Sequence, residues 1–397
     1  MGFFEGKRIL ILGGTGFLGS ALAHHLVRDL GIAPGSIRIF YLAGTPTGSL
    51  RDLPGLDLFP GSILDRAAVA KAFDGAHLVF HLAASTSFDP ARKRDQWLVN
   101  VEGTRNVLEA ARETHSFEKM CYTSSVNALG VPSPPGTIGT PATADPYLAR
   151  PRLHSFRTRE EVLTFVEDVR RDPSAPGWER SIGIGYFDSK LAAQELVQCS
   201  VAHAGLAVVS VMPGTSFGPY DFLIGNGTYL LSLYHNKMPG VLRGGFSTAH
   251  VEDVVEGHLL ALEKGKPGSR YIITGHAEDN LHFREAMGSM ARALRERFPQ
   301  KKIRSPRIVF PAFLAGMVAW LSEKAAAARH KPCLLSRAAV RAGSQPLFYS
   351  NEESERDLGY KPQRAFAEGV SEMIAYFQAE GLFESRGRSI DKPGLDR

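Results

Sequence analysis

The sequence predicts an α/β fold built on a doubly wound parallel sheet. Segments of helical spacing, such as residues 16–30 and 94–114, alternate with short apolar runs: "RILILGG" from residue 8, "SIRIFYLA" from residue 36, "AHLVFHLAA" from residue 76 and "FEKMCYTSS" from residue 117. Strands that are apolar throughout are typical of a parallel sheet that is covered by helices on both faces. We therefore expect parallel strands between two layers of helices.

The composition is that of a globular protein. The chain has 397 residues, of which 44% are hydrophobic, and its net charge is only +5. Because the basic residues are scattered, a nucleic-acid partner is not expected. The sequence contains no run of eighteen apolar residues and no leader pattern, so we expect a cytoplasmic protein. Its three cysteines, Cys121, Cys199 and Cys333, are far apart, which predicts reduced thiols and no metal site.

A glycine-rich turn follows the first predicted strand. Gly13, Gly16 and Gly19 lie three residues apart and lead directly into a helix. The first glycine permits a tight turn, the second lets the backbone approach a pyrophosphate, and the third lets the helix pack closely on the strand. The amino end of the helix then faces the anion. In this strand–turn–helix context, the motif predicts a Rossmann sheet that binds a dinucleotide.

The second predicted strand bears on the choice of nicotinamide cofactor. An acidic residue at its tip would hold the ribose 2′-hydroxyl of NAD, whereas a 2′-phosphate requires a basic residue. The segment "IFYLAGTPTGSLRDL" has no acid at the tip, and its first basic residue is Arg51. The absence of the acid favours NADP(H), and NAD(H) stays an alternative, since Arg51 fits a solvated loop charge slightly better than a phosphate contact.

A tyrosine–lysine pair begins the helical segment "YFDSKLAAQEL". Tyr186 and Lys190 are four residues apart, so one helical turn brings both to one face. A phenol can donate a proton to a carbonyl if a neighbouring ammonium lowers its pKa. Ser125 lies at the end of another predicted strand, where its hydroxyl could hold that carbonyl. Taken alone, the pair is also compatible with a packed tyrosine and a solvated lysine.

Several segments together resemble one known family. They are "GGTGFLG", "VFHLAA", "VNVEGTRNVLEAA", "YTSSVNALG", "YFDSK", "VMPGTSFGPYD" and "AHVEDVVEGHLLALEKGKPGSRYIITG", which spread from residue 8 to about residue 275. The chain resembles an extended short-chain dehydrogenase/reductase, a member of the NAD-dependent epimerase/dehydratase superfamily. Within it, the chain is similar to the branch of dihydroflavonol reductases, cinnamoyl-CoA reductases and 3β-hydroxysteroid dehydrogenases.

The resemblance implies roles for individual residues. Tyr186 is the expected proton donor or acceptor, Lys190 modulates its pKa and clamps the ribose, and Ser125, five residues before Gly130, orients the carbonyl. Asn100 is expected to support the site from a helix. The expected cofactor contacts are Gly13, Thr15, Gly16, Phe17, Leu18, Gly19, Arg51, Ser62, Ile63, Leu82, Ala83, Ala84, Lys190, Pro213, Gly214, Thr215 and Ser216. Ser62 replaces an acid that usually holds the adenine, so Asp65 and the Ile63 backbone are expected to take its place.

The resemblance also implies a domain organisation. Residues 1–213 are the expected dinucleotide-binding domain, and residues 214–384 mainly a smaller substrate-binding domain with segments that return to the core; residues 385–397 read as a tail. An insertion at about residues 131–183 predicts a lid, with a surface excursion or an oligomer contact as alternatives. Relatives often dimerise through helices that correspond to residues 95–113 and 186–204, so a homodimer is compatible with the sequence.

Two further segments allow more than one interpretation. His250, Asp253, Glu256 and His258 could suggest a metal site, but their spacing fits an amphipathic helix. Residues 307–330 form the most apolar helical segment and are too short to span a bilayer. This segment could line a pocket for a bulky apolar substrate, make a peripheral membrane contact or pack into the core.

These observations predict an NADP(H)-dependent oxidoreductase. Its Ser-Tyr-Lys triad would interconvert a ketone and a secondary alcohol on a medium-sized, largely apolar substrate. A nucleotide-sugar epimerase or dehydratase with retained NAD and a thioester (acyl-CoA) reductase are the enzyme alternatives. A redox-sensing binding protein on the same fold would normally lack the tyrosine or the lysine.

Overall fold

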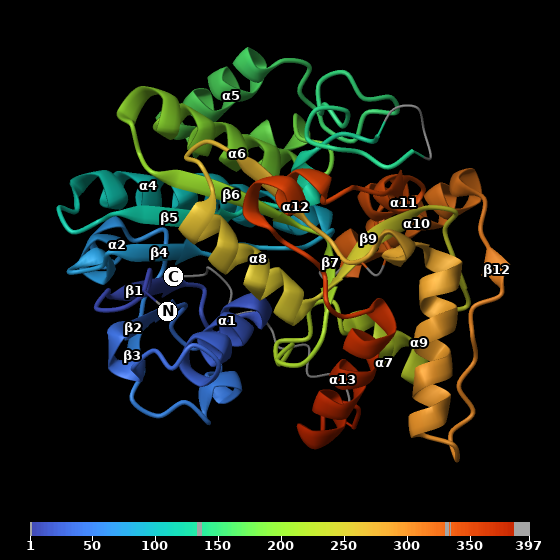
Figure 1. Cartoon of the computed structure of the whole chain (residues 1–397). Coiled ribbons are helices and arrows are strands. Elements are labelled where there is room, and N and C mark those ends of the chain that lie inside the picture. Colours follow the sequence, from blue (N-terminus) through green and yellow to red (C-terminus); the bar gives the residue numbers. More distant parts are fainter. Residues whose placement is uncertain (1, 133–136, 330–332, 334, 385–397) are drawn as a thin grey trace.

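A seven-stranded sheet forms the centre of the protein (Figure 1). The computed structural model describes residues 2–132, 137–329, 333 and 335–384. The strand order is β10-β6-β5-β4-β1-β2-β3, and every neighbouring pair is parallel. The strands are β1 (Ile9–Leu12), β2 (Ile37–Tyr41), β3 (Asp57–Pro60), β4 (Leu78–His81), β5 (Lys119–Thr123), β6 (Val208–Pro213) and β10 (Arg270–Ile273). The predicted doubly wound sheet is confirmed.

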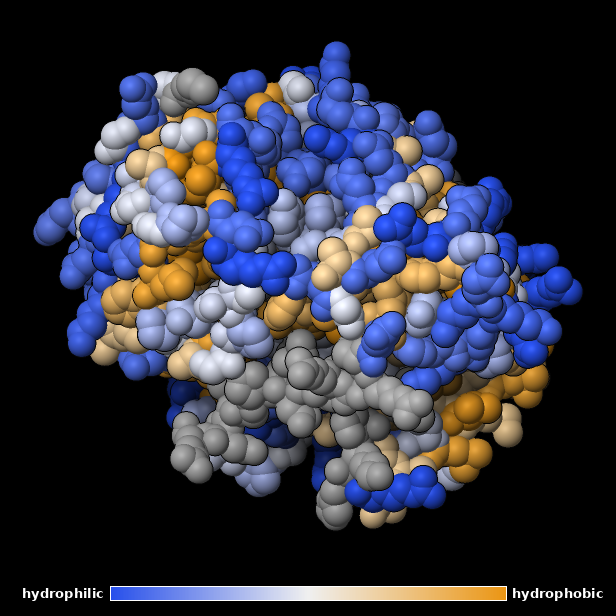
Figure 2. Space-filling model, turned by 90° about the horizontal axis from the view of Figure 1, so that it is seen from below, coloured by the Kyte–Doolittle hydropathy of each residue, from blue (hydrophilic) through white to orange (hydrophobic). Residues whose placement is uncertain are grey.

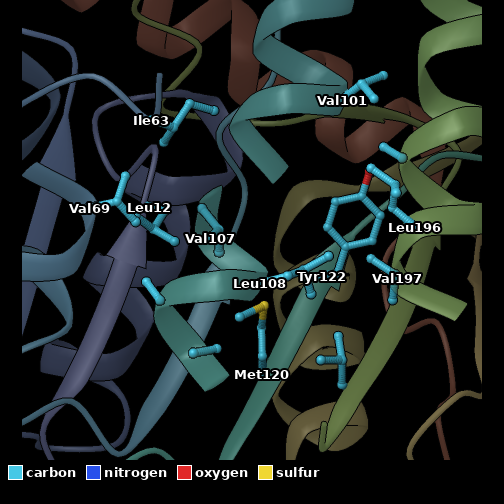
Figure 3. Close-up of a cluster of buried hydrophobic side chains, with 14 of the residues drawn as sticks. Leu12, Ile63, Val69, Val101, Val107, Leu108, Met120, Tyr122, Leu196 and Val197 are labelled. Atoms are coloured by element: carbon cyan, nitrogen blue, oxygen red, sulfur yellow. The ribbon is translucent and has the colours of Figure 1, made fainter. Parts of the chain in front are cut away.

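Helices cover both faces of this sheet (Figure 1). One face carries α2 (Arg66–Phe73), α3 (Lys93–Trp97), α4 (Gly103–Glu113) and α6 (Gly185–Ala204). The other carries α1 (Phe17–Arg28), α8 (Val251–Lys264) and α12 (Glu352–Leu358). Figure 3 shows the core beneath α4 and α6, where buried side chains of the strands meet buried side chains of the helices: Leu12, Met120, Tyr122, Val107, Leu108, Leu196 and Val197. Removal of this apolar surface from water is the main force that holds the layers together.

The strand order reverses beside β1. This strand pairs with β2 on one side and with β4 on the other. In open parallel sheets, ligands bind outside the carboxyl ends of the strands at such a reversal. The ends of β1, β4, β5 and β6 therefore define the edge where a site is expected.

A smaller unit follows β6. Its central strand, β9 (Gly245–His250), pairs with β7 (Thr215–Phe217), β11 (Asn280–His282) and β13 (Pro346–Leu347). Separately, β8 (Gly240–Val241) pairs with β12 (Ile308–Val309). The helices α7 (Thr228–Tyr234), α9 (Phe283–Arg297) and α13 (Phe366–Ala379) contribute to one apolar cluster with Phe217. The predicted tail, residues 385–397, lies outside the described residues.

The long segment between β5 and α6 adds an outer layer to the core. Its helix α5 (Arg159–Arg171) lies on the outside of α6 (Figure 1) and buries Val162, Val166 and Val169. The side chains of Phe156, Phe165 and Trp178 contact the ring of Trp97. Because α5 is packed in this way, the predicted lid stays a prediction for the residues that precede α5. Helix α5 also covers part of α6, which is one of the two helices expected in a dimer interface.

Within the segment at residues 307–330, helix α10 (Ala312–Arg329) packs beside α11 (Arg337–Gly343). Of the three interpretations of this segment, core packing does not hold for the large apolar side chains of α10. Only the small side chains of Ala315 and Ala319 are buried, because they contact Val340 of α11. The large apolar side chains of α10 point outward. Among the described helices, none is long and apolar enough to cross a membrane.

We predict that the aromatic cluster around Trp97 contributes strongly to stability. Phe156 is 4% exposed and contacts both Trp97 and Phe165. Phe156→Ala should lower the free energy of unfolding by about 3–5 kcal/mol, because it leaves a cavity. Phe156→Leu keeps most of the volume and should cost less than half as much. Denaturant unfolding measures both, and an equal or negligible loss would contradict the packed layer.

Candidate active site

The glycine turn brings β1, α1 and β4 into close contact. Gly13 has a positive φ of 86°, which favours glycine. A Cβ atom there would lie 2.7 Å from the backbone nitrogen of Ala83, and one at Gly19 would lie 2.4 Å from the carbonyl oxygen of Gly13. Any larger residue at either position would push the backbone apart. The turn is thus held at the carboxyl ends of β1 and β4.

This turn fits a dinucleotide. Gly16 is the extended N-cap residue of α1, and no side chain forms a capping hydrogen bond there. The first turn of α1 also has no acidic residue. Backbone N–H groups at such a helix start can bind a phosphate. The predicted cofactor residues Thr15, Phe17 and Leu18 lie in the same turn, so this part of the chain would hold the pyrophosphate.

Other predicted cofactor residues lie at the same edge of the sheet. Leu82, Ala83 and Ala84 directly follow β4. The run from Pro213 to Ser216 joins β6 to β7, and it contains Gly214 and Thr215. The geometry therefore brings the glycine turn and both loops to the carboxyl ends of the central strands.

The residues predicted to hold the adenine are bonded within the protein. Ser62 Oγ accepts a hydrogen bond from the Leu64 backbone at 3.2 Å. The Ile63 carbonyl accepts one from Asn106 at 2.9 Å. Asp65 caps α2 by accepting from two backbone N–H groups, so its carboxylate has a structural role.

Arg51 lies in an exposed position after the turn η2 (Gly48–Leu50). Its guanidinium forms an ion pair with Glu380, next to the end of α13. Ser49, in the same turn, accepts a hydrogen bond from Ser20 of α1 at 2.8 Å. This bond keeps the loop beside the start of α1.

Ser125 and Tyr186 meet at the end of β5. Ser125 is 7% exposed and caps the short turn η5 (Val126–Ala128), where its hydroxyl accepts from Asn127 at 3.2 Å. Tyr186 lies in the first turn of α6, with its phenol near enough to the Ser125 hydroxyl to interact with it. Burial raises the pKa of Tyr186, and the interaction with Ser125 offsets only part of the rise. The expected lowering of the phenol pKa by Lys190 is therefore not found in this geometry. A raised pKa keeps the phenol protonated.

Lys190 is buried one turn further along α6. Its side chain is 3% exposed, and Nζ donates to the Thr123 carbonyl at 2.8 Å. Burial lowers the pKa of this amine to about 7. The Thr123 hydroxyl is 2.9 Å from His258, whose pKa burial lowers to about 4. His258, considered above for a metal site, is thus a neutral ring that helps to fix the end of β5.

Asn100 lies in a π-helical turn, η4 (Leu98–Glu102), between α3 and α4. Its amide donates to Ser189 of α6 at 2.9 Å and to the Ser85 carbonyl at 3.0 Å, and its oxygen accepts from the Ser85 backbone at 2.8 Å. One side chain therefore joins the loop after β4 to the helix that carries Tyr186 and Lys190. Insertions of this kind are frequent at functional sites.

Asp188 is a site residue that sequence reasoning missed. It is fully buried in the first turn of α6. Its carboxylate accepts from the Ser155 backbone and hydroxyl, both at 2.8 Å, and from the Gly183 backbone at 2.7 Å. The only signal in the sequence is an acid between Tyr186 and Lys190. Asp188 ties the insertion to the start of the helix that holds Tyr186.

Phe88 adds an apolar wall beside the tyrosine. Its ring centroid lies 6.2 Å from that of Tyr186, and its side chain is 40% exposed. The arrangement combines a protonated phenol, a hydroxyl, a buried amine and a dinucleotide turn. Such a site can protonate a carbonyl oxygen while a hydride is transferred.

A family comparison agrees with this chemistry. The profile of the NAD dependent epimerase/dehydratase family matches residues 9–152 and 183–274, which is more than half of the chain. The chain belongs to this family. It is an NAD(P)-dependent enzyme of the extended short-chain dehydrogenase/reductase superfamily. The unmatched stretch between the two parts, residues 153–182, contains α5.

Individual relatives span nearly the whole chain. Sterol demethylase protein B of Methylococcus capsulatus is 26% identical over 94% of this chain and 99% of its own length. Anthocyanidin reductase of Arabidopsis thaliana is 23% identical over 96% of this chain and 97% of its own length. The crystal structure of gox2253 is similar with a TM-score of 0.68 and 27% identity, covering 94% of this chain and 99% of that one.

We predict that burial of Lys190 costs stability in a pH-dependent way. Its folded pKa of about 7 lies below its ordinary value of 10.5. Between these values the unfolded chain binds one proton more, so the stability of the protein rises with pH across this range. Lys190→Met should therefore raise the free energy of unfolding, most strongly near pH 7 and below, with the gain shrinking towards about pH 10.

Denaturant unfolding at several pH values measures this gain. Lys266→Met, at an exposed position, is the matched control and should change stability little at any pH. A Lys190→Met effect that does not vary with pH would contradict the buried amine.

Proposed function

We propose that this family member is a reductase that interconverts a ketone and a secondary alcohol. The observation that carries the proposal is the proximity of the Ser125 hydroxyl to the Tyr186 phenol at the end of β5, with the buried amine of Lys190 one turn away. The pKa of Tyr186 is raised by burial, so its phenol is neutral and holds the proton that this reaction requires.

The residues would divide the chemistry between them. Tyr186 Oη donates the proton to the carbonyl oxygen, and the Ser125 hydroxyl positions that oxygen. Lys190, when charged, stabilises negative charge as it develops on the oxygen. When bound, the reduced nicotinamide supplies the hydride that adds to the carbonyl carbon. The glycine turn, the loop after β4 and the loop after β6 would hold this cofactor.

The surroundings of the pair support an apolar substrate. Phe88 lies against Tyr186, and the apolar cluster beside it contains Val126, Leu129 and Ile184. A dehydratase also needs an acid that protonates a leaving hydroxyl. The run "TSSVNALG" from Thr123 offers no carboxylate, and Asp188 is fully bonded. The name of the relative sterol demethylase protein B points to the same class of substrate.

NADP(H) is the proposed cofactor. The loop after β2 has no acidic residue before Asp52, and Arg51 is the first basic side chain after the strand. The partner of Arg51, Glu380, belongs to a distant part of the sequence. Both side chains lie beside the turn η2, which is bonded to Ser20 of α1 through Ser49. In this proposal the guanidinium binds the 2′-phosphate.

Replacement of the phenol tests the reaction. Tyr186→Phe should lower kcat for reduction of a bulky aryl or alicyclic ketone by about 10²–10⁴-fold, because general acid catalysis is lost. Cofactor affinity should change less than about twofold, since the ring stays. Tyr234→Phe, on α7, is the control with unchanged rate. Activity of Tyr186→Phe within about tenfold of the wild-type rate would overturn the assignment. The assignment would also be overturned if the wild-type protein reduced no ketone and retained NAD tightly through purification.

Replacement of Arg51 tests the cofactor. Arg51→Gln should raise KM for NADPH by about tenfold and leave KM for NADH nearly unchanged, because a charge-assisted hydrogen bond to phosphate is lost. Glu380→Gln removes the carboxylate and should lower KM for NADPH. Steady-state rates with both cofactors measure these changes. Equal effects of Arg51→Gln on the two cofactors would contradict a 2′-phosphate contact.

A further inference from the structure

Helix α10 presents its large apolar residues to the outside. The α10 face is defined here by six exposed side chains: Phe313, Leu314, Met317, Val318, Trp320 and Leu321. Eight of the thirteen exposed large hydrophobic residues in the described chain lie between Ile308 and Leu321. A soluble surface rarely concentrates apolar side chains in this way, so the α10 face requires a partner.

A groove runs along this face between α10 and α11. It has a volume of about 740 Å³ and is lined on one side by Phe313, Met317 and Trp320, and on the other by Arg337 and Arg341. In Figure 1, α10 lies at the right of the molecule; seen from below, Figure 2 shows apolar side chains gathered at the lower right edge. The groove is lined mainly by apolar side chains, and of its two arginines Arg337 is ion-paired with Glu323.

The segment around α10 is strongly basic. Residues 301–345 contain nine Lys or Arg and a single acid, Glu323. The net charge of this segment is +8, whereas that of the whole chain is +5, so the rest of the chain is slightly acidic. Glu323 is paired with Arg337, so it does not neutralise the rest. An apolar helix with Trp and Phe on one face and basic residues around it is typical of a helix that lies in the interface of an anionic bilayer.

Helix α11, which lines the groove, is connected to Tyr186 through Phe88. Ser336 caps α11, and its hydroxyl donates to the Phe88 carbonyl at 2.7 Å. The Phe88 ring lies against Tyr186. Arg341 donates to the Arg152 carbonyl at 3.1 Å, which joins the other end of α11 to the insertion. Phe88 therefore contacts both the start of α11, through its carbonyl, and the proposed proton donor, through its ring.

We propose that the α10 face docks on the surface of an anionic lipid bilayer, and that the substrate enters from this layer. A second copy of the chain fits less well, because a symmetric interface would bring the basic segments of both copies together. The substrate would then be a ketone or secondary alcohol dissolved in the membrane. This part of the inference rests on the proposed function, whereas docking itself does not.

Vesicle flotation tests docking without any activity. The wild-type chain should float with phosphatidylcholine vesicles that contain phosphatidylglycerol, several-fold more than with phosphatidylcholine alone, and high salt should weaken this binding. Combined Phe313→Asp and Met317→Asp substitutions should lower partitioning about tenfold or more, because two side chains no longer insert. Leu148→Asp is the matched control, since Leu148 is 76% exposed in another part of the surface.

Wild-type protein that stays off both kinds of vesicle overturns the proposal, as does equal loss in the Leu148→Asp control. A dimer in sedimentation that the double substitution dissociates, without flotation, would show a protein interface instead and also overturns it.

The substrate class has a separate readout. For the wild-type chain we compare reduction of a vesicle-embedded ketone with that of a water-soluble ketone, and the ratio of the two rates should fall about tenfold in the double variant. An unchanged ratio with lost flotation overturns delivery from the membrane. No reduction of either ketone overturns the proposed function and leaves the flotation result in place.

Discussion

Burial of the Lys190 amine is the constraint on which the site depends. An amine without water must find a fixed acceptor, and here it donates to the carbonyl of Thr123, the last residue of β5. That bond fixes the distance between the end of a central strand and the helix α6, and Tyr186 and Ser125 meet because of it. The cost of burial lowers the pKa of Lys190 to about 7. The fold tolerates this cost because the sheet and α6 are held by the apolar core on the same face, which Figure 3 shows.

The start of α6 is fixed from both sides by neutral and acidic groups that do no chemistry. Asn100, in its π-helical turn, joins Ser189 to the loop after β4. Asp188 holds Ser155 and Gly183, so the insertion is anchored within a few residues of Tyr186. α5 then continues the insertion as a packed layer on the outside of α6. The segment between β5 and α6 is therefore bonded directly to the start of the helix that carries Tyr186 and Lys190, and a lid formed by the residues before α5 stays a prediction.

The parts of this site that the sequence predicts are local. The glycine turn is recognised from the spacing of its glycines between a strand and a helix. Tyr186 and Lys190 are recognised because they are one helical turn apart. Both patterns therefore lie within a few residues of sequence. The partners of Asp188 and Asn100 are not visible, because Ser155 and Ser85 come from distant turns whose approach depends on the whole fold. The rise in the pKa of Tyr186 could not be predicted from the sequence either, because it depends on how deeply the phenol is buried. Burial also lowers the pKa of the neighbouring Lys190 amine, so this amine carries less positive charge with which to lower the pKa of the phenol. The orientation of α10 could not be predicted either, because the helix has apolar residues on two faces. The face with Ala315 and Ala319 packs against α11, and the face with the large apolar side chains is exposed.

The orientation of α10 shows how packing geometry can expose the most hydrophobic part of a chain. α10 approaches α11 through Ala315 and Ala319, and small residues allow the two helices to come close. Close approach gains dispersion contacts where the two helices meet but leaves the side chains of Phe313, Met317 and Trp320 exposed. A helix selected only for stability in water would reverse this arrangement, since exposed side chains of this size forgo about 1.5–3 kcal/mol each of burial. The arrangement is stable at low cost only if another apolar medium covers the outer face. In the docking proposed above, an anionic lipid surface is this medium, because it would cover the apolar side chains and attract the basic segment at residues 301–345.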